Sequence, residues 1–123
     1  MHQSRPKNLN LMTIRFPLPA IVSILHRITG VLLFLLIPIL LWSLDYSLSL
    51  YGFDSLQKWF GHFYVKVFLW LCLIPFCFHL IAGVRHLLSD IHIGDTLKGG
   101  RTGSIGVFIL SILFVILVGV WLW

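Results

Sequence analysis

Three long stretches of this chain contain no Asp, Glu, Lys or Arg. They cover residues 28–44, 67–84 and 102–123, which are 17, 18 and 22 residues long. A helix needs about 20 apolar residues to cross the hydrocarbon core of a bilayer, so each stretch is long enough or nearly so. The pattern predicts an all-α integral membrane protein, a single domain over 1–123, with three transmembrane helices at about 20–48, 60–88 and 104–123.

Proline and glycine mark the expected boundaries and irregularities. Residues 1–19 form an N-terminal segment, and the first helix is expected to begin near Pro19, because proline is tolerated in a first helical turn. Pro38 and Pro75 lie inside the first two helices, where each removes one backbone hydrogen bond and favours a kink. Residues 94–103 include four glycines and are expected to form a flexible polar connection.

Composition excludes an ordinary soluble enzyme. Hydrophobic residues make up 59% of the chain and charged residues 11%, against about 45–50% and about 25% in soluble domains. Once three spans are placed, too few residues remain for a catalytic or cofactor-binding domain outside the membrane. Cys72 and Cys77 are the only cysteines, which excludes a disulfide framework and the four-cysteine set of an iron–sulfur cluster.

Charge predicts the orientation. The net charge is +5, but the basic residues bracket the apolar stretches and do not form one patch, so we expect no nucleic-acid partner. Seven of the nine lie on one side of the three-span arrangement, namely Arg5, Lys7, Arg15, Arg27, Arg85, Lys98 and Arg101. Because Lys and Arg are enriched in cytoplasmic segments, the N-terminus and residues 89–103 are predicted to be cytoplasmic, and residues 45–61 and the C-terminus periplasmic.

Two groups of polar residues lie at or near membrane depth, where ionisable side chains are costly and usually functional. The first helix carries, on one face, Ser23, His26, Arg27 and Gly30. The second carries, within one narrow stripe, Cys72, His79, Gly83, His86 and Asp90. Both groups lie toward the predicted cytoplasmic ends, so antiparallel packing of these helices would bring them together.

His79 is the histidine deepest in a span. It can be a neutral histidine that hydrogen-bonds across helices or a member of a proton relay. Alternatively it is an axial ligand of haem iron, with space for a flat macrocycle at Ala82 and Gly83 one turn further on. No other histidine of the chain lies at that depth, so the second axial ligand of a six-coordinate haem would come from another subunit.

The remaining polar residues also allow two interpretations. His26, Arg27 and His86 can extend to water at the interface, or they can bind the anionic propionates of a haem. Ser23 can bond to its own helix, or donate a hydrogen bond to a carbonyl-bearing ligand beside Arg27. Asp90 can be solvated or paired with Arg85, or it can donate protons near a redox site.

Two long motifs resemble those of a known family. The first comprises Arg5-Pro6, then Thr13 to Pro17, then Ser23-Ile24-Leu25-His26-Arg27-Ile28-Thr29-Gly30. The second runs from His79 through Gly83 and His86 to Asp90. Together they resemble the larger cytochrome b membrane-anchor subunit of bacterial succinate dehydrogenase, respiratory complex II, over nearly the whole chain.

The resemblance implies a role for each matching residue. His79 would be the axial ligand of a b-type haem whose other ligand is a histidine of the smaller anchor subunit. Ser23 and Arg27 would line the ubiquinone site near the cytoplasmic face, with Ile24, Phe16 and the acid Asp90 nearby. His26, Arg27 and His86 would lie near the haem propionates.

The resemblance also implies partners and a location. These are the small hydrophobic anchor subunit, the iron–sulfur subunit and the flavoprotein subunit, in the bacterial inner membrane. The chain would take part in the enzyme without holding its flavin or its succinate-oxidising site. Two alternatives remain at this point, the anchor of a quinol:fumarate reductase and a small non-redox membrane scaffold or proton-relay subunit.

Overall fold

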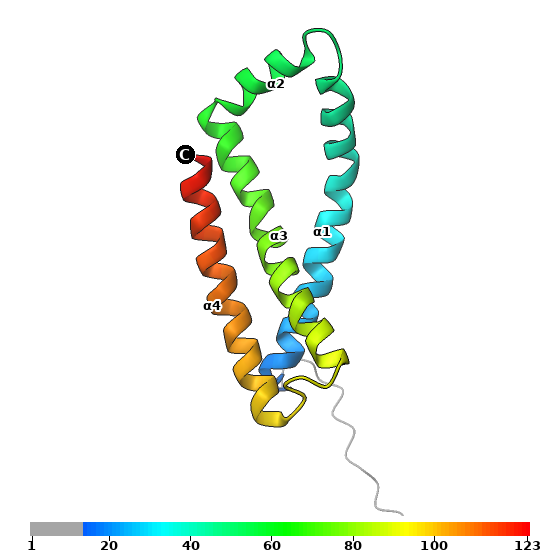
Figure 1. Cartoon of the computed structure of the whole chain (residues 1–123), viewed down its shortest axis with the longest axis vertical. Coiled ribbons are helices and arrows are strands. Elements are labelled where there is room, and N and C mark those ends of the chain that lie inside the picture. The colour runs from blue at the N-terminus through cyan, green and yellow to red at the C-terminus, as the bar shows by residue number, and fades with distance from the viewer. Residues whose placement is uncertain (1–13) are drawn as a thin grey trace, which may run out of the picture.

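The computed structural model describes residues 14–123, and the regular secondary structure of this part of the chain is entirely helical. The elements are α1 (Leu18–Ser47), α2 (Gly52–Phe60), α3 (Phe63–Asp90) and α4 (Leu97–Leu122), as Figure 1 shows. By length and composition α1, α3 and α4 can each cross a membrane. The predicted all-α class with three transmembrane helices is therefore confirmed. The Arg5-Pro6 motif, Lys7 and Thr13 lie outside the described residues.

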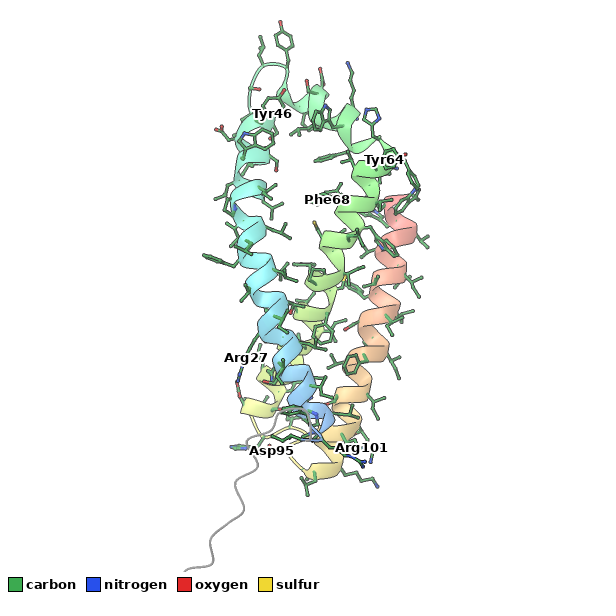
Figure 2. The ribbon with its side chains drawn as sticks, turned by 180° about the vertical axis from the view of Figure 1, so that it is seen from behind. Arg27, Tyr46, Tyr64, Phe68, Asp95 and Arg101 are labelled. Carbon is green, nitrogen blue, oxygen red and sulfur yellow. The ribbon has the colours of Figure 1, made fainter. Side chains whose placement is uncertain are left out.

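The three long helices meet closely at one end of the molecule. Helices α3 and α4 run side by side, whereas α1 approaches them near the α3–α4 connection and diverges from α3 toward α2 (Figure 1). Val22, Ala82 and Val107, one from each long helix, are buried where the three meet. The compact part of the bundle is thus the end that also carries Arg27, Asp95 and Arg101 (Figure 2).

Beyond this core, α1 is largely unpacked. Phe34, Leu40 and Trp42 are 69%, 62% and 63% exposed, and most of their neighbours are similar. Such a surface is much larger than a water-soluble monomer exposes, so it must face lipid or other protein chains. Tyr46 and Tyr64 lie at the end of the molecule where α1 and α3 diverge, opposite to Arg27 and Arg101, as Figure 2 shows.

The connection predicted for residues 45–61 contains the short helix α2. Its first residue, Gly52, is buried, and its N–H donates to the carbonyl of Ser49 at 3.1 Å. A Cβ atom at Gly52 would overlap the carbonyl oxygen of Tyr46. Only glycine permits this close approach of backbone to backbone, which places α2 directly after α1.

The last helix begins at Leu97. The glycine-rich residues before Ser104 predicted a start at Ser104, and this prediction is wrong. Thr96 is the N-cap, and its hydroxyl accepts a hydrogen bond from the N–H of Gly99 at 3.0 Å. This cap satisfies one of the free N–H groups of the first turn, which offsets the low helix propensity of Gly99 and Gly100. The flexible segment is shortened to the turn around His92 and Gly94, both with positive φ of 61° and 75°.

The other helix ends lie near the predicted ones. Helix α1 begins one residue before Pro19, and α3 covers 63–90 where the prediction was about 60–88. Pro38 and Pro75 lie within α1 and α3, and neither interrupts its helix. Cys77 is buried, Cys72 is half-buried and both are free, as expected for small apolar side chains.

Candidate functional site

Three histidine rings come together where α1 and α3 pack. The rings of His26 and His79 are stacked, with centroids 4.0 Å apart and planes at 12°. His86, two turns after His79 on α3, lies with its ring centroid 5.1 Å from that of His26. The predicted convergence of the two polar faces is therefore correct for these three residues.

His79 is held by α1 through one of its ring nitrogens. Nδ1 lies 3.1 Å from the backbone oxygen of His26 and 3.2 Å from the hydroxyl of Thr29. A carbonyl oxygen only accepts hydrogen bonds, so Nδ1 carries the proton. In a neutral imidazole the other nitrogen, Nε2, then has a free lone pair. Nε2 makes no hydrogen bond within residues 14–123, so it is available as a ligand.

Two glycines allow the rings to pack between the helices. A Cβ atom at Gly30 would lie 3.1 Å from Cε1 of His79, and one at Gly83 would lie 3.3 Å from Nε2 of His26. Both distances are too short for ordinary contact. The expectation that Ala82 and Gly83 leave space for a macrocycle is wrong in this structure. Ala82 is buried in the core against Val22 and Val107, and Gly83 faces the His26 ring.

The donor set fits a haem better than a bare metal ion. Residues 14–123 contain no group of three or more His, Cys, Asp or Glu side chains that could hold a metal. A haem needs few protein ligands, and an imidazole is one that proteins commonly supply to it. Nε2 of His26 is buried and has no hydrogen-bond partner within the described chain, which is costly unless a bound group or subunit supplies one.

Ser23, Arg27 and Asp90 are not enclosed by residues 14–123. Ser23 is half-buried on α1, Arg27 is exposed one turn later, and Asp90 is the exposed last residue of α3. Arg27 points away from the bundle at the end that also bears Asp95 and Arg101 (Figure 2). Ile24, also predicted to be near the quinone, is 41% exposed. Within residues 14–123, nothing closes a ligand site on this side.

Two cavities open near the same end, and neither is lined by Ser23, Arg27 or Asp90. One, of about 650 Å³, lies between the start of α1 and the α3–α4 connection and is lined by Phe16 and Arg101 among others. The other, of about 530 Å³, is an apolar groove between α3 and α4. Phe16 therefore shares the first cavity with Arg101.

From the sequence, Arg85 was expected only to pair with Asp90. In the structure it joins two helices. It lines both cavities, and its guanidinium donates to the carbonyl of Gly100 at 3.2 Å, linking α3 to the first turn of α4. Among residues 14–123 it forms no ion pair with Asp90. The available signal was the cost of a guanidinium so close to an apolar stretch, which requires a partner.

Comparison with known proteins places this geometry in a family. Residues 1–118 match the family described as the succinate dehydrogenase/fumarate reductase transmembrane subunit. The chain belongs to this family. Its relatives include the succinate dehydrogenase cytochrome b556 subunit of Coxiella burnetii, which is 38% identical over the full length of both chains. The protein of the same name from Rickettsia prowazekii is 35% identical, over 98% of this chain and 94% of its own.

Family membership confirms the resemblance drawn from the two motifs. A third relative, the succinate dehydrogenase cytochrome b556 subunit of Paracoccus denitrificans, is 29% identical over 93% of this chain and 88% of its own. As a succinate dehydrogenase/fumarate reductase transmembrane subunit, the chain is a membrane component of a multi-subunit oxidoreductase. Its exposed apolar helices and its incompletely enclosed polar residues agree with such a place.

Proposed function

We propose that this chain is the cytochrome b anchor subunit of a succinate:ubiquinone oxidoreductase in a bacterial inner membrane. It would hold haem b jointly with a small anchor subunit, help to form the quinone-reduction site on the cytoplasmic side, and dock the iron–sulfur and flavoprotein subunits. The observation that carries the proposal is His79, whose Nδ1 is held by α1 while Nε2 keeps a free lone pair. This is how a histidine is prepared to bind a metal.

The second axial ligand is assigned to the partner subunit. Among residues 14–123, the imidazole of His26 is stacked on that of His79, with centroids 4.0 Å apart. Because the stacked rings leave no space for a bound group between them, His26 would not hold the haem together with His79. When bound, haem supplies a one-electron redox centre. His26, His86 and Arg27 would donate hydrogen bonds to its propionates.

Ser23 and Arg27 are assigned to the quinone. Negative charge develops on a quinone oxygen as it is reduced, and the Ser23 hydroxyl and Arg27 guanidinium can stabilise this charge where water is excluded. Ile24 and Phe16 would contact the apolar part, and Asp90 would deliver protons from the cytoplasmic side. The exposure of Arg27 supports a site that the iron–sulfur and small anchor subunits complete.

The quinone assignment is tested with Arg27→Leu in the purified complex. Succinate:quinone activity should fall by at least about 100-fold, because a charged hydrogen bond of about 1.5–3 kcal/mol and the neutralising charge are both lost. Oxidation of succinate with an artificial acceptor should be unchanged, since the flavin lies elsewhere. Lys98→Leu, which changes an exposed cation in the first turn of α4 that lines neither cavity, is the control. Equal loss of both activities in Arg27→Leu would contradict the assignment.

The haem assignment is tested with His79→Ala. The reduced-minus-oxidised spectrum of the complex should lose its b-type bands, and a spectrum identical to that of the wild type would refute the ligand. A wild-type preparation with no Soret band would favour the non-redox scaffold instead. The family also covers fumarate reductases. A rate of quinol:fumarate reduction above that of succinate:quinone reduction would favour that alternative direction.

A further inference from the structure

Thr29 is the side chain of α1 that contacts His79 directly through a hydroxyl. It lies three residues after His26 and is half-buried. Its Oγ1 atom is 2.9 Å from the carbonyl oxygen of Leu25, 2.9 Å from that of His26 and 3.2 Å from Nδ1 of His79. One hydroxyl therefore connects two turns of α1 with the histidine on α3.

The direction of these hydrogen bonds follows from the atoms involved. A threonine hydroxyl has one proton and two lone pairs. The carbonyls of Leu25 and His26 only accept, so they share the hydroxyl proton. Toward His79 the oxygen of Thr29 therefore acts as the acceptor, and Nδ1–H of His79 is shared between Oγ1 and the carbonyl oxygen of His26. Both contacts select the same tautomer.

We infer that Thr29 is a positioning residue for His79: its hydroxyl oxygen, with the backbone oxygen of His26, fixes the ring orientation and the Nδ1–H tautomer that present Nε2 to the haem iron. The inference rests on the proposed function. Groups that accept a hydrogen bond from the distal nitrogen of a metal-bound histidine also raise its basicity, and their loss typically lowers metal affinity about 10- to 100-fold.

The chain contains a matched control for the plain structural role of a helix threonine. Thr102 on α4 bonds back to its own helix in the same way, 3.0 Å from the carbonyl of Lys98 and 3.2 Å from that of Gly99, and makes no hydrogen bond to a histidine of residues 14–123. Back-bonding of this kind contributes little to stability and bends helices slightly. Thr29→Val and Thr102→Val therefore remove the same local bond, but only the first removes an acceptor from His79.

The experiment measures haem loss from the intact complex to excess apomyoglobin. Thr29→Val should release haem about 10- to 100-fold faster than the wild type, and Thr102→Val at the wild-type rate. Thr29→Ser keeps the hydroxyl and should restore the wild-type rate. The low-spin ferric signal in electron paramagnetic resonance reports the orientation of the axial imidazoles. It should broaden or shift in Thr29→Val and return in Thr29→Ser.

The outcomes separate this inference from the proposed function. If His79→Ala loses its haem but Thr29→Val releases haem and gives a ferric signal like Thr102→Val, the inference is overturned and the ligand assignment stands. If His79→Ala keeps a wild-type spectrum, the ligand assignment of the proposed function fails, and this inference fails with it. If Thr29→Val does not assemble, Thr29→Ala, which leaves more room at the helix contact, is measured in the same way with the same expected result.

Discussion

The α1–α3 and α3–α4 contacts use the same packing device, a glycine facing an aromatic ring. At the first, Gly30 of α1 faces the imidazole of His79, where a Cβ atom would lie 3.1 Å from Cε1. At the second, Gly119 of α4 faces the indole of Trp70, where a Cβ atom would lie 2.9 Å from Nε1. In both cases the absent side chain lets a large ring pack close to the neighbouring helix.

The two contacts differ in whether a ring nitrogen remains without a hydrogen-bond partner. The only polar atom of Trp70, Nε1, donates to the carbonyl of Val115 at 3.1 Å, so the indole is satisfied within the chain. His79 uses Nδ1 toward α1 and keeps Nε2. Next to it, Nε2 of His26 is buried with no partner in residues 14–123. Unused donor or acceptor atoms in a close helix contact, and not the close contact itself, distinguish a candidate site from packing.

The largest expected effect comes from filling the two glycine positions with the same side chain. Gly30→Val should displace the His79 ring and lower the haem content of the complex at least about 10-fold, because the ligand leaves its hydrogen-bonded position. Gly119→Val should displace Trp70 and destabilise the α3–α4 contact by about 1–3 kcal/mol through overpacking. The haem-to-flavin ratio of purified complexes measures the first effect.

These two variants also test the comparison directly. Gly119→Val should keep a haem-to-flavin ratio equal to that of the wild type in whatever complex assembles, with a lower melting temperature in detergent. Equal haem loss in both variants would mean that haem content reports bundle stability alone. The distinction drawn between the two contacts would then be wrong.

His26→Phe tests the unpartnered nitrogen beside His79. Phenylalanine keeps a ring that can stack on His79 but removes Nε2. A hydrogen bond to a charged group contributes about 1.5–3 kcal/mol, so loss of a propionate bond should speed haem release to apomyoglobin about 10- to 100-fold. If the nitrogen has no ligand in the assembled complex, removing a buried unsatisfied atom should instead leave the haem in place and raise stability. That result would contradict the propionate assignment.

Trp70→Phe is the matched change at the contact that is already satisfied. It removes the hydrogen bond to the carbonyl of Val115 and retains an aromatic ring. Interhelical hydrogen bonds in membrane proteins average about 0.6 kcal/mol and reach about 1.7 kcal/mol, so a small fall in the melting temperature of the complex is expected. Haem release should remain at the wild-type rate, and a change of 10-fold or more would indicate coupling between the two contacts.

The fold was predictable where apolar length decides it. Residues 28–44, 67–84 and 102–123 gave the three long helices, because a membrane span needs little more than an uninterrupted apolar stretch. The start of α4 was not predictable. The glycine content of residues 94–103 predicts a loop, whereas a single N-cap hydrogen bond, accepted by Thr96, allows the helix to begin at Leu97. Helix α2 begins at Gly52, where the backbone lies close to the carbonyl oxygen of Tyr46. No periodic pattern in the sequence signals this contact.

The site was predictable in its components and not in its geometry. Helical spacing placed His26, His79 and His86 on facing stripes, and the structure brings them together. Spacing cannot show that these rings occupy the space beside Gly30 and Gly83, or that the hydroxyl of Thr29 contacts Nδ1 of His79. Residues 14–123 leave Arg27 and Asp90 exposed and Ser23 half-buried, so the geometry of a site at these residues does not follow from helical spacing.

The smallest expected effect tests whether any unpartnered buried atom marks a site. Ser111 of α4 is 5% exposed, and its hydroxyl has no hydrogen-bond partner in the described part of the chain. It lies on the helix that contributes to the satisfied contact, and no titratable ring accompanies it. Ser111→Ala should leave haem release unchanged and raise the free energy of unfolding by up to about 1 kcal/mol, because an unsatisfied buried hydroxyl carries a desolvation cost.

Ser104→Ala is the control for Ser111→Ala on the same helix. Ser104 is fully buried, but its hydroxyl donates to the carbonyl of Gly100 at 2.7 Å. Because this bond stays within α4 and contributes little to stability, Ser104→Ala should leave the free energy of unfolding nearly unchanged, in contrast to the rise expected for Ser111→Ala. Melting temperatures of the two purified complexes measure the difference. If Ser111→Ala instead speeds haem release, a buried polar atom without a hydrogen-bond partner is enough to identify a site. A neighbouring imidazole, such as that of His79 beside His26, would then not be required.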